Sequence, residues 1–172
     1  MNDSTYIIET KQLTKNYGRL NALAPIDLQL QSGSALALLG RNGSGKSTLI
    51  RLLMGFIRPS FGTAKVLGAN PCSCPEKIRA RIGYVSDAQD LPSAMTPAQY
   101  LAYLRPFYPS WDHEFEKRLI RLFDVPLDRK IGNLSRGQRV KAAFVGALAF
   151  HPSLLLLDEP FSGLDPACVM KC

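Results

Sequence analysis

The sequence predicts an α/β fold, because apolar runs typical of buried strands alternate along the chain with segments of helical apolar spacing. Residues 35–39 and 154–157 are continuously apolar, as expected for strands that are covered on both faces. Residues 47–54 and 136–150 instead carry apolar side chains at helical intervals. The 172 residues contain no repeat and no linker, so we expect a single domain with a helical insertion at about residues 90–135.

The composition excludes several classes of protein. There are 21 Lys+Arg against 14 Asp+Glu, a net charge of +7, and 46% of the residues are apolar, which is enough for a core and argues against disorder. The longest near-apolar run, residues 142–150, is far shorter than the roughly 18 residues that a spanning helix needs. Asp3 stands where a signal peptide would carry positive charge, so we expect a cytosolic chain. The excess positive charge is compatible with nucleic acid, an anionic membrane surface or phosphate ligands.

The four cysteines do not form a metal-binding pattern. Cys72 and Cys74 are one residue apart, and Cys168 and Cys172 lie near the end of the chain. Neither pair has the spacing or the well-placed histidines of a zinc site. Reduced, unpaired thiols are the simpler interpretation in a cytosolic chain.

The elements of the first half follow from alternation and from a capping residue. Residues 26–31 alternate between apolar and polar side chains, which predicts a half-exposed strand. The helix predicted over residues 47–54 ends at Gly55, a natural C-terminal cap. Residues 81–85 are a further candidate strand.

Two capping boxes mark helix starts in the second half. Residues 96–99, Thr-Pro-Ala-Gln, open a helix to about Leu104, and residues 135–138, Ser-Arg-Gly-Gln, open one to about Phe150. Between them a further helix is predicted after Trp111-Asp112. One face of that helix is expected to carry Phe115, Leu119, Leu122 and Phe123.

A glycine-rich segment predicts the main ligand site. Residues 40–47, Gly-Arg-Asn-Gly-Ser-Gly-Lys-Ser, match the pattern G-x-x-x-x-G-K-[ST] and lie between a predicted strand and a predicted helix. In this context backbone amides of the loop point at phosphate oxygens, Lys46 holds the β- and γ-phosphates, and the Ser47 hydroxyl contacts Mg²⁺. The alternative, a glycine-rich turn without a ligand, does not explain both flanking elements. The residues expected to bind the nucleotide are Gly40, Asn42, Gly43, Ser44, Gly45, Lys46, Ser47 and Thr48.

Two acidic residues complete the predicted site. Residues 154–157 form a strand that ends in Asp158 and Glu159. Asp158 is then at the carboxyl edge of the sheet, where it can contact Mg²⁺, and Glu159 can orient or deprotonate the attacking water. A solvated acidic turn is the alternative, which the nearby phosphate loop disfavours.

Residues 134–138, Leu-Ser-Arg-Gly-Gln, indicate a family. With them the chain, from about Ile7 to Pro166, resembles the nucleotide-binding subunits of ATP-binding-cassette (ABC) transporters, whose signature is Leu-Ser-Gly-Gly-Gln. The resemblance implies ATP as the nucleotide and a P-loop NTPase core sheet with an N-terminal antiparallel β subdomain and a helical insertion. It also implies that Ser135, Gly137 and Gln138 contact the γ-phosphate of ATP held by the opposite subunit. Arg136 replaces the first signature glycine.

The resemblance assigns further roles by position. Tyr17 matches an aromatic residue that stacks on adenine; the alternative is a half-buried strand tyrosine. Residues 162–165, Ser-Gly-Leu-Asp, resemble a loop that crosses the dimer interface. The helices at 97–104 and 113–124 match the subdomain that contacts the membrane-embedded partner.

One departure concerns the loop that faces Mg²⁺. The family has a glutamine after the segment that here reads Ile82-Gly83-Tyr84-Val85-Ser86, and this chain has Asp87 at that position and Gln89 two residues later. Asp87 is the positional match and its carboxylate can contact Mg²⁺ or its water shell. Gln89 reaches in only if the loop bulges, and a solvated acid is the third possibility.

The other departure is the end of the chain. The family places a histidine that contacts the γ-phosphate on a strand after the loop at Asp165, whereas neither His113 nor His151 of this chain can take that role. The resemblance places the same strand between the phosphate-loop strand and the strand of Asp158. We therefore expect a C-terminally truncated fold, arising from a frameshift near residues 166–172, with low stability and little ATP turnover.

The functional expectation is an ATP-binding and ATP-hydrolysing subunit that pairs head to tail with a second copy or a homologue and powers a transmembrane permease. Residues 107–112 look like the drug and antibiotic exporter branch. The implied location is cytoplasmic, peripheral on the inner face of the membrane. The alternatives are a fragment with little activity and a soluble ABC ATPase acting on nucleic acid, although no nucleic acid is expected as a partner. The transported substrate belongs to the permease and is not encoded here.

Overall fold

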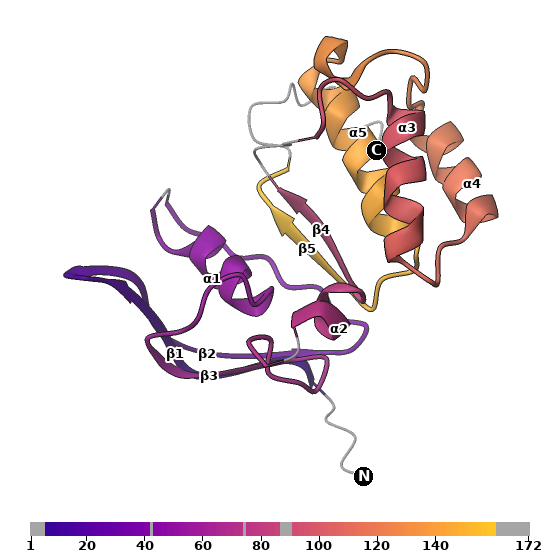
Figure 1. Cartoon of the computed structure of the whole chain (residues 1–172). Coiled ribbons are helices and arrows are strands. Elements are labelled where there is room, and N and C mark those ends of the chain that lie inside the picture. Colours follow the sequence, from indigo (N-terminus) through magenta and orange to yellow (C-terminus); the bar gives the residue numbers. More distant parts are fainter. Residues whose placement is uncertain (1–5, 42, 74, 87–90, 161–172) are drawn as a thin grey trace. The chain divides into compact units, whose positions relative to one another are not determined.

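The computed structural model describes residues 6–41, 43–73, 75–86 and 91–160, which divide into two compact units (Figure 1). The first unit contains the residues up to Arg79 and the second those from Ala80 onward. The α/β fold class predicted from the sequence is confirmed, since one unit is built on an antiparallel sheet and the other on a parallel strand pair covered by helices.

The first unit is built on a three-stranded antiparallel sheet of order β2-β1-β3, in agreement with the expected N-terminal subdomain. Along β2 the side chains of residues 26–31 alternate between half-buried and exposed, as their sequence pattern predicts. The half-buried side chains therefore lie on the face of the sheet against which the rest of the unit packs. The elements of this unit are β1 (Tyr6–Tyr17), β2 (Leu20–Gln31), α1 (Lys46–Leu53), β3 (Phe61–Val66) and α2 (Pro75–Arg79).

Helix α1 forms where its capping residues and apolar spacing predict it. It begins after Gly45 and ends at Met54, followed by Gly55 in the left-handed region with φ of 69°. The helix contacts β2 and β3 through its buried face. The side chains of that face are Leu49, Ile50, Leu52 and Leu53.

The prediction of a buried strand over residues 35–39 is wrong for the described structure. These residues belong to neither described sheet, and Leu39 is 94% exposed. An apolar, extended segment becomes a strand only when a neighbouring strand takes up its backbone hydrogen bonds. None of the described strands does so here, and a local run of apolar residues carries no information about that partner.

The second unit combines a parallel strand pair with helices. Strands β4 and β5 pair in register from Ile82 opposite Leu154 to Ser86 opposite Asp158, and α5 packs on β4. Both strands and the two helices expected in the insertion are confirmed, and their ends differ from the predicted ones by at most one residue. The elements are β4 (Ile82–Ser86), α3 (Pro97–Leu104), η1 (Arg105–Phe107), α4 (His113–Phe123), η2 (Ile131–Asn133), α5 (Arg136–Leu148) and β5 (Leu154–Asp158).

The burial of β5 is less complete than its four leucines suggest. Leu154 and Leu156 are buried, and Leu155 packs against Ala143 and Ala147 of α5. Leu157 lies on the same face as Leu155 but is 40% exposed. The prediction of a strand is confirmed, whereas the prediction that all of it is covered on both faces is wrong at this residue, because the packing on that face does not extend to the strand end.

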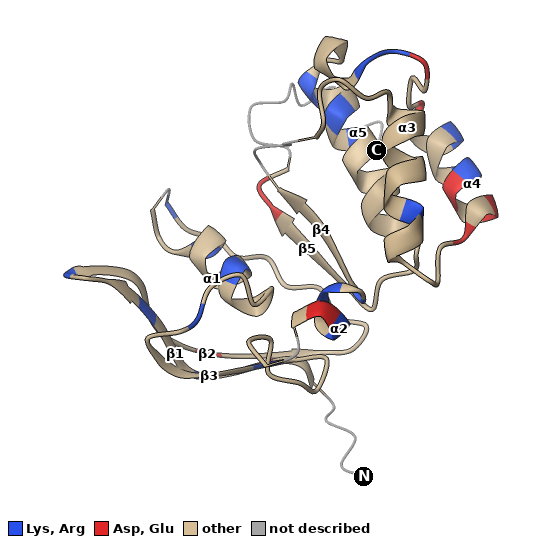
Figure 2. Cartoon of the chain, in the orientation of Figure 1, with Lys and Arg blue, Asp and Glu red and all other residues tan. Residues whose placement is uncertain are grey.

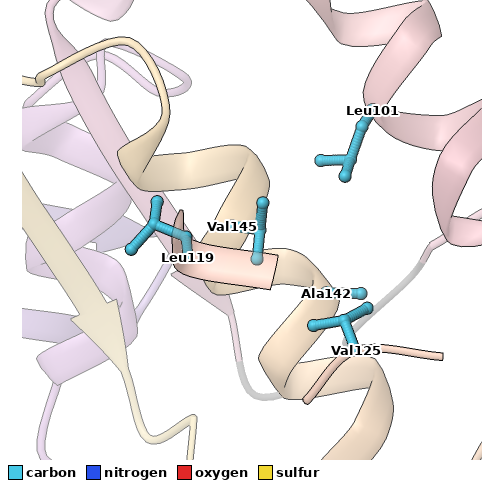
Figure 3. Close-up of a cluster of buried hydrophobic side chains, with 5 residues drawn as sticks. All are labelled: Leu101, Leu119, Val125, Ala142 and Val145. Atoms are coloured by element: carbon cyan, nitrogen blue, oxygen red, sulfur yellow. The ribbon is translucent and has the colours of Figure 1, made fainter. Parts of the chain in front are cut away.

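The helices share one core, to which α3, α4 and α5 each contribute (Figure 3). Its buried members are Leu101, Leu119, Val125, Ala142 and Val145. The two predicted capping boxes are both present and begin α3 and α5 at the expected residues.

The buried face of α4 is not quite the one that its apolar residues predict. Leu122 is 68% exposed, while Glu116 is only 4% exposed. The carboxylate of Glu116 accepts hydrogen bonds from Arg105 Nη2 at 2.8 Å and from Trp111 Nε1 at 2.7 Å. A polar residue therefore takes a core position, because two side chains from outside the helix satisfy its oxygens.

Glu116 makes the stability of this unit depend on pH. Burial by itself raises the pKa of Glu116, but the hydrogen bonds from Arg105 and Trp111 outweigh it and hold the pKa below 4.5. A lowered folded-state pKa contributes stability that is present above the unfolded value and is lost as pH falls through the folded value.

We expect Glu116→Gln to destabilise the protein by about 2 kcal/mol at pH 7, because it removes charge-assisted hydrogen bonds at a buried site. The difference from the parent should shrink as the pH falls below about 4.5, measured by urea unfolding at several pH values. Glu114→Gln, a matched change on the exposed side of α4, should have little effect. A constant difference between pH 7 and pH 3 would contradict this account.

Candidate functional site

The glycine-rich segment forms a curled loop ahead of α1. Lys46 Nζ donates to the carbonyl oxygens of Gly40 at 2.8 Å and Arg41 at 3.3 Å, and Ser44 N–H donates to the carbonyl of Arg41 at 3.1 Å. The ammonium group is thus held across the loop by the backbone of residues five and six positions earlier. This is the local arrangement expected of a loop that encloses an anion.

One glycine is required by the path of this loop. Gly45 has φ of 95°, and a Cβ atom there would lie 2.7 Å from the carbonyl oxygen of Ala22 in β2, so a larger residue is excluded. At Gly40 the loop packs against its own Ser44 side chain, with a Cβ position 2.6 Å from Ser44 Oγ.

The electrostatics of the loop favour an anion. The first turn of α1 contains no acidic residue, and the N-terminal end of a helix carries partial positive charge from its unpaired amides. Arg41 and Lys46 add two formal charges. Ser47 is exposed and Thr48 is half-buried at the start of α1, whereas Asn42 lies outside the described residues.

Tyr17 ends β1, and its side chain is 48% exposed, more than expected for a half-buried strand tyrosine. Lys15 Nζ lies over the ring, 4.8 Å from its centroid. This contact was not predicted from the sequence. The alternation of side chains along a strand places residues 15 and 17 on one face and is the signal that could have indicated it.

The acidic residues lie at the carboxyl edge of the strand pair in the second unit. Asp158 ends β5 opposite Ser86, which ends β4, and it is half-buried. Acidic colouring is visible at the tip of β5 in Figure 2. The backbone turns sharply at Glu159, with φ of 50°, a conformation that costs a non-glycine residue about 1 kcal/mol.

The predictions for Asp87 and Gln89 fall outside the described residues, as do those for residues 162–165. Ser86, the last described residue before that gap, is in register with Asp158.

The start of α5 is a capping box. Ser135 Oγ accepts from Gln138 N–H at 3.2 Å, and Gln138 Oε1 accepts from Ser135 N–H at 3.0 Å. The Gln138 side chain therefore holds the helix start in shape. Gly137 is in the first turn, where an amide has no carbonyl partner within the helix.

The described site residues fall into groups within each unit. Residues 17 and 40–48 belong to the first unit, and Ser135–Gln138 with Asp158 and Glu159 belong to the second. Within the described residues no three His, Cys, Asp or Glu side chains gather as a metal site. No helix in the described part of the chain is long and apolar enough to cross a membrane.

A phosphate-type loop before a helix, with an acidic pair at a parallel sheet edge, defines a nucleotide-binding α/β protein. Comparison with known proteins places it more narrowly. Residues 23–162 match the model of the ABC transporter family, and the chain belongs to this family.

The chain is similar to both import and resistance proteins. It is 35% identical to the sulfate/thiosulfate import ATP-binding protein CysA of Synechococcus elongatus, over 95% of this chain and 48% of that protein. It is also 35% identical to the daunorubicin/doxorubicin resistance ATP-binding protein DrrA of Streptomyces peucetius, over 94% of this chain and 51% of that protein. The chain thus spans about half the length of these relatives.

The fold is also that of solved ABC proteins. A dimeric structure of a bacterial ABC transporter cassette matches with a TM-score of 0.80, over 95% of this chain and 78% of that chain. The sequence identity is 24%, so this likeness concerns the fold alone.

Proposed function

We propose that this chain is the ATP-binding and ATP-hydrolysing subunit of a membrane transporter. The observation that carries the proposal is the loop at residues 40–46, in which the Lys46 ammonium is held over a curled, glycine-lined backbone at the start of α1. A loop of this shape and charge fits the β- and γ-phosphates of a nucleotide.

The roles in the first unit follow from the groups that the loop presents. Lys46 exchanges its hydrogen bonds to the carbonyls of Gly40 and Arg41 for phosphate oxygens, and the amides of residues 43–48 surround those oxygens. Tyr17, with its ring largely exposed, stacks on adenine. The Ser47 hydroxyl is a ligand for Mg²⁺.

Asp158 is proposed as a carboxylate ligand of Mg²⁺ by its position in the family pattern. Hydroxyl and carboxylate oxygens are hard donors of the kind that Mg²⁺ takes in nucleotide sites. Bound Mg²⁺ offsets the charge of the phosphates. Asp87 is proposed as a further contact to Mg²⁺ or its water shell, by its position in the family pattern.

Glu159 is proposed as the base that orients and deprotonates the attacking water. Strand β5 ends at Asp158, and the backbone at Glu159 is in the left-handed region with φ of 50°. A strained backbone at such a position is typical of functional sites.

The second nucleotide contact comes from another subunit. The capped start of α5, with Ser135 and the Gly137 amide, forms an anion site that contacts the γ-phosphate held by the opposite subunit in a head-to-tail dimer. A solved cassette of the same fold is described as dimeric, which supports a dimer, and the head-to-tail arrangement is proposed from the family resemblance. ATP binding then closes the dimer, and hydrolysis reopens it.

The partner that these movements drive is a transmembrane permease, which holds the chain at the cytoplasmic face of the membrane. Export is favoured by the resemblance of residues 107–112 to drug exporters and by the similarity to DrrA. The import protein CysA matches at the same identity, so the proposal of export rests chiefly on residues 107–112.

The test of this function is equilibrium binding of a fluorescent ATP analogue to the 172-residue chain with Mg²⁺. ATP should displace the analogue at least about tenfold better than AMP, because most contacts are to the β- and γ-phosphates. Equal displacement by ATP and AMP would contradict the proposed site. Displacement by single-stranded RNA, lost steeply with added salt, would favour the nucleic-acid alternative instead.

A further inference from the structure

The end of β1 is tied to a segment more than forty residues away. Lys15 Nζ donates to the carbonyl oxygen of Arg58 at 2.8 Å. Asn16 N–H donates to Ser60 Oγ at 3.0 Å, and the Ser60 hydroxyl donates back to the Asn16 carbonyl at 3.3 Å. Ser60 N–H also donates to the carbonyl of Thr14 at 2.8 Å. Residues 14–16 are therefore anchored by several contacts to the segment at 58–60.

The same lysine covers the ring of Tyr17. Its ammonium nitrogen is 4.8 Å from the ring centroid, a distance at which a cation is attracted to an aromatic face. The ammonium also donates to the Arg58 carbonyl, and this hydrogen bond favours its position over the ring. An aromatic ring has two faces, and since Tyr17 is 48% exposed, the ring keeps surface that a second flat group can cover.

We infer that Lys15 is a positioning residue that fixes Tyr17 for stacking on the base of the bound nucleotide. This inference rests on the proposed nucleotide site and adds to it the group that orders the stacking side chain. An exposed tyrosine at a strand end has free rotamers, and binding has to restrict them. A ring that is already held loses less freedom when the base stacks on it.

If Lys15 has this role, its loss affects contacts to the base and not contacts to the phosphates, and the two can be measured separately. A ligand with the phosphates but no base makes no use of Tyr17. Losing the Lys15 contact should therefore weaken binding of ATP and leave binding of inorganic tripolyphosphate unchanged. A lysine that acted as a general positive charge would affect both ligands, because tripolyphosphate carries the same kind of charge.

The experiment measures the affinity of the 172-residue chain for Mg²⁺–ATP and Mg²⁺–tripolyphosphate by displacement of a fluorescent ATP analogue. In Lys15→Met, which keeps the aliphatic stem and loses the charge, ATP should bind about three- to tenfold more weakly and tripolyphosphate as before. Lys15→Arg should restore most of the preference for ATP, since a guanidinium can both donate to the Arg58 carbonyl and cover the ring.

Two further variants complete the design. Lys11→Met is the matched control, because it removes the same charge from an exposed position on the same strand, and both affinities should be unchanged. Tyr17→Ala should lower the affinity for ATP toward that for tripolyphosphate. Retained tripolyphosphate binding shows that each variant still forms the phosphate loop.

The outcomes distinguish the inference from the proposed function. An equal loss for both ligands in Lys15→Met, or no loss while Tyr17→Ala weakens ATP binding, overturns the role of Lys15 and leaves the nucleotide site standing. Unchanged ATP binding in Tyr17→Ala removes base stacking and the inference together. Failure of the parent chain to bind either ligand overturns the proposed function itself.

Discussion

Lys46→Ala is expected to weaken binding of ATP at least about 100-fold, because it removes the charged donor to two phosphates in a loop whose backbone is shaped around that side chain. Two hydrogen bonds of Lys46 Nζ, to the carbonyls of Gly40 at 2.8 Å and Arg41 at 3.3 Å, are within the loop itself. Alanine leaves those carbonyls to water at an exposed site, so the fold should change little.

The measurement is displacement of a fluorescent ATP analogue, with the melting temperature recorded alongside. Lys77→Ala is the matched control, since Lys77 is an exposed lysine of α2 in the same unit. Its affinity for ATP should equal that of the parent. Undiminished ATP binding by Lys46→Ala would remove the assignment of the phosphate loop.

Glu159→Gln is expected to slow ATP hydrolysis about 100-fold or more and to leave ATP binding intact. General base catalysis typically contributes about two to four orders of magnitude, and an amide cannot accept the proton of the attacking water. Glutamine has the same size as glutamate, and the φ of 50° at this position costs both side chains the same. The variant should therefore accumulate as an ATP-bound dimer.

Single-turnover hydrolysis with protein in excess detects even slow chemistry, and size-exclusion chromatography with ATP and Mg²⁺ reports the dimer. Glu114→Gln is the matched control, because it makes the same change on an exposed residue of α4. If the parent hydrolyses ATP measurably and Glu159→Gln does so at the same rate, Glu159 is not the base. If only monomer elutes, the head-to-tail arrangement loses its support.

The candidate site was predictable largely because its parts are short and contiguous. Residues 40–47 contain in one stretch the glycines, the lysine and the hydroxyl that a phosphate loop needs. The capping boxes at residues 96–99 and 135–138 are equally local, and α3 and α5 begin where these residues predict. Asp158 follows a strand that the run of leucines indicates.

Features that depend on distant partners were not predictable in this way. Residues 35–39 have the composition of a buried strand and yet form none within the described structure. Leu122 has the spacing of a core residue and is exposed, while Glu116 is buried. In each case the local pattern is compatible with two outcomes, and the neighbours decide between them.

The sequence by itself therefore determined the class of this protein and the starts of its main helices, because local backbone conformation and capping are set by adjacent residues. It also indicated the residues now proposed as the phosphate loop and the acidic pair. Only the tertiary structure showed that Glu116 is buried with hydrogen bonds from Arg105 and Trp111. Only the tertiary structure showed that Lys15, which donates to the Arg58 carbonyl, lies over the ring of Tyr17. Those outcomes depend on hydrogen-bond partners brought from elsewhere in the chain, and a one-dimensional pattern does not specify which partners arrive.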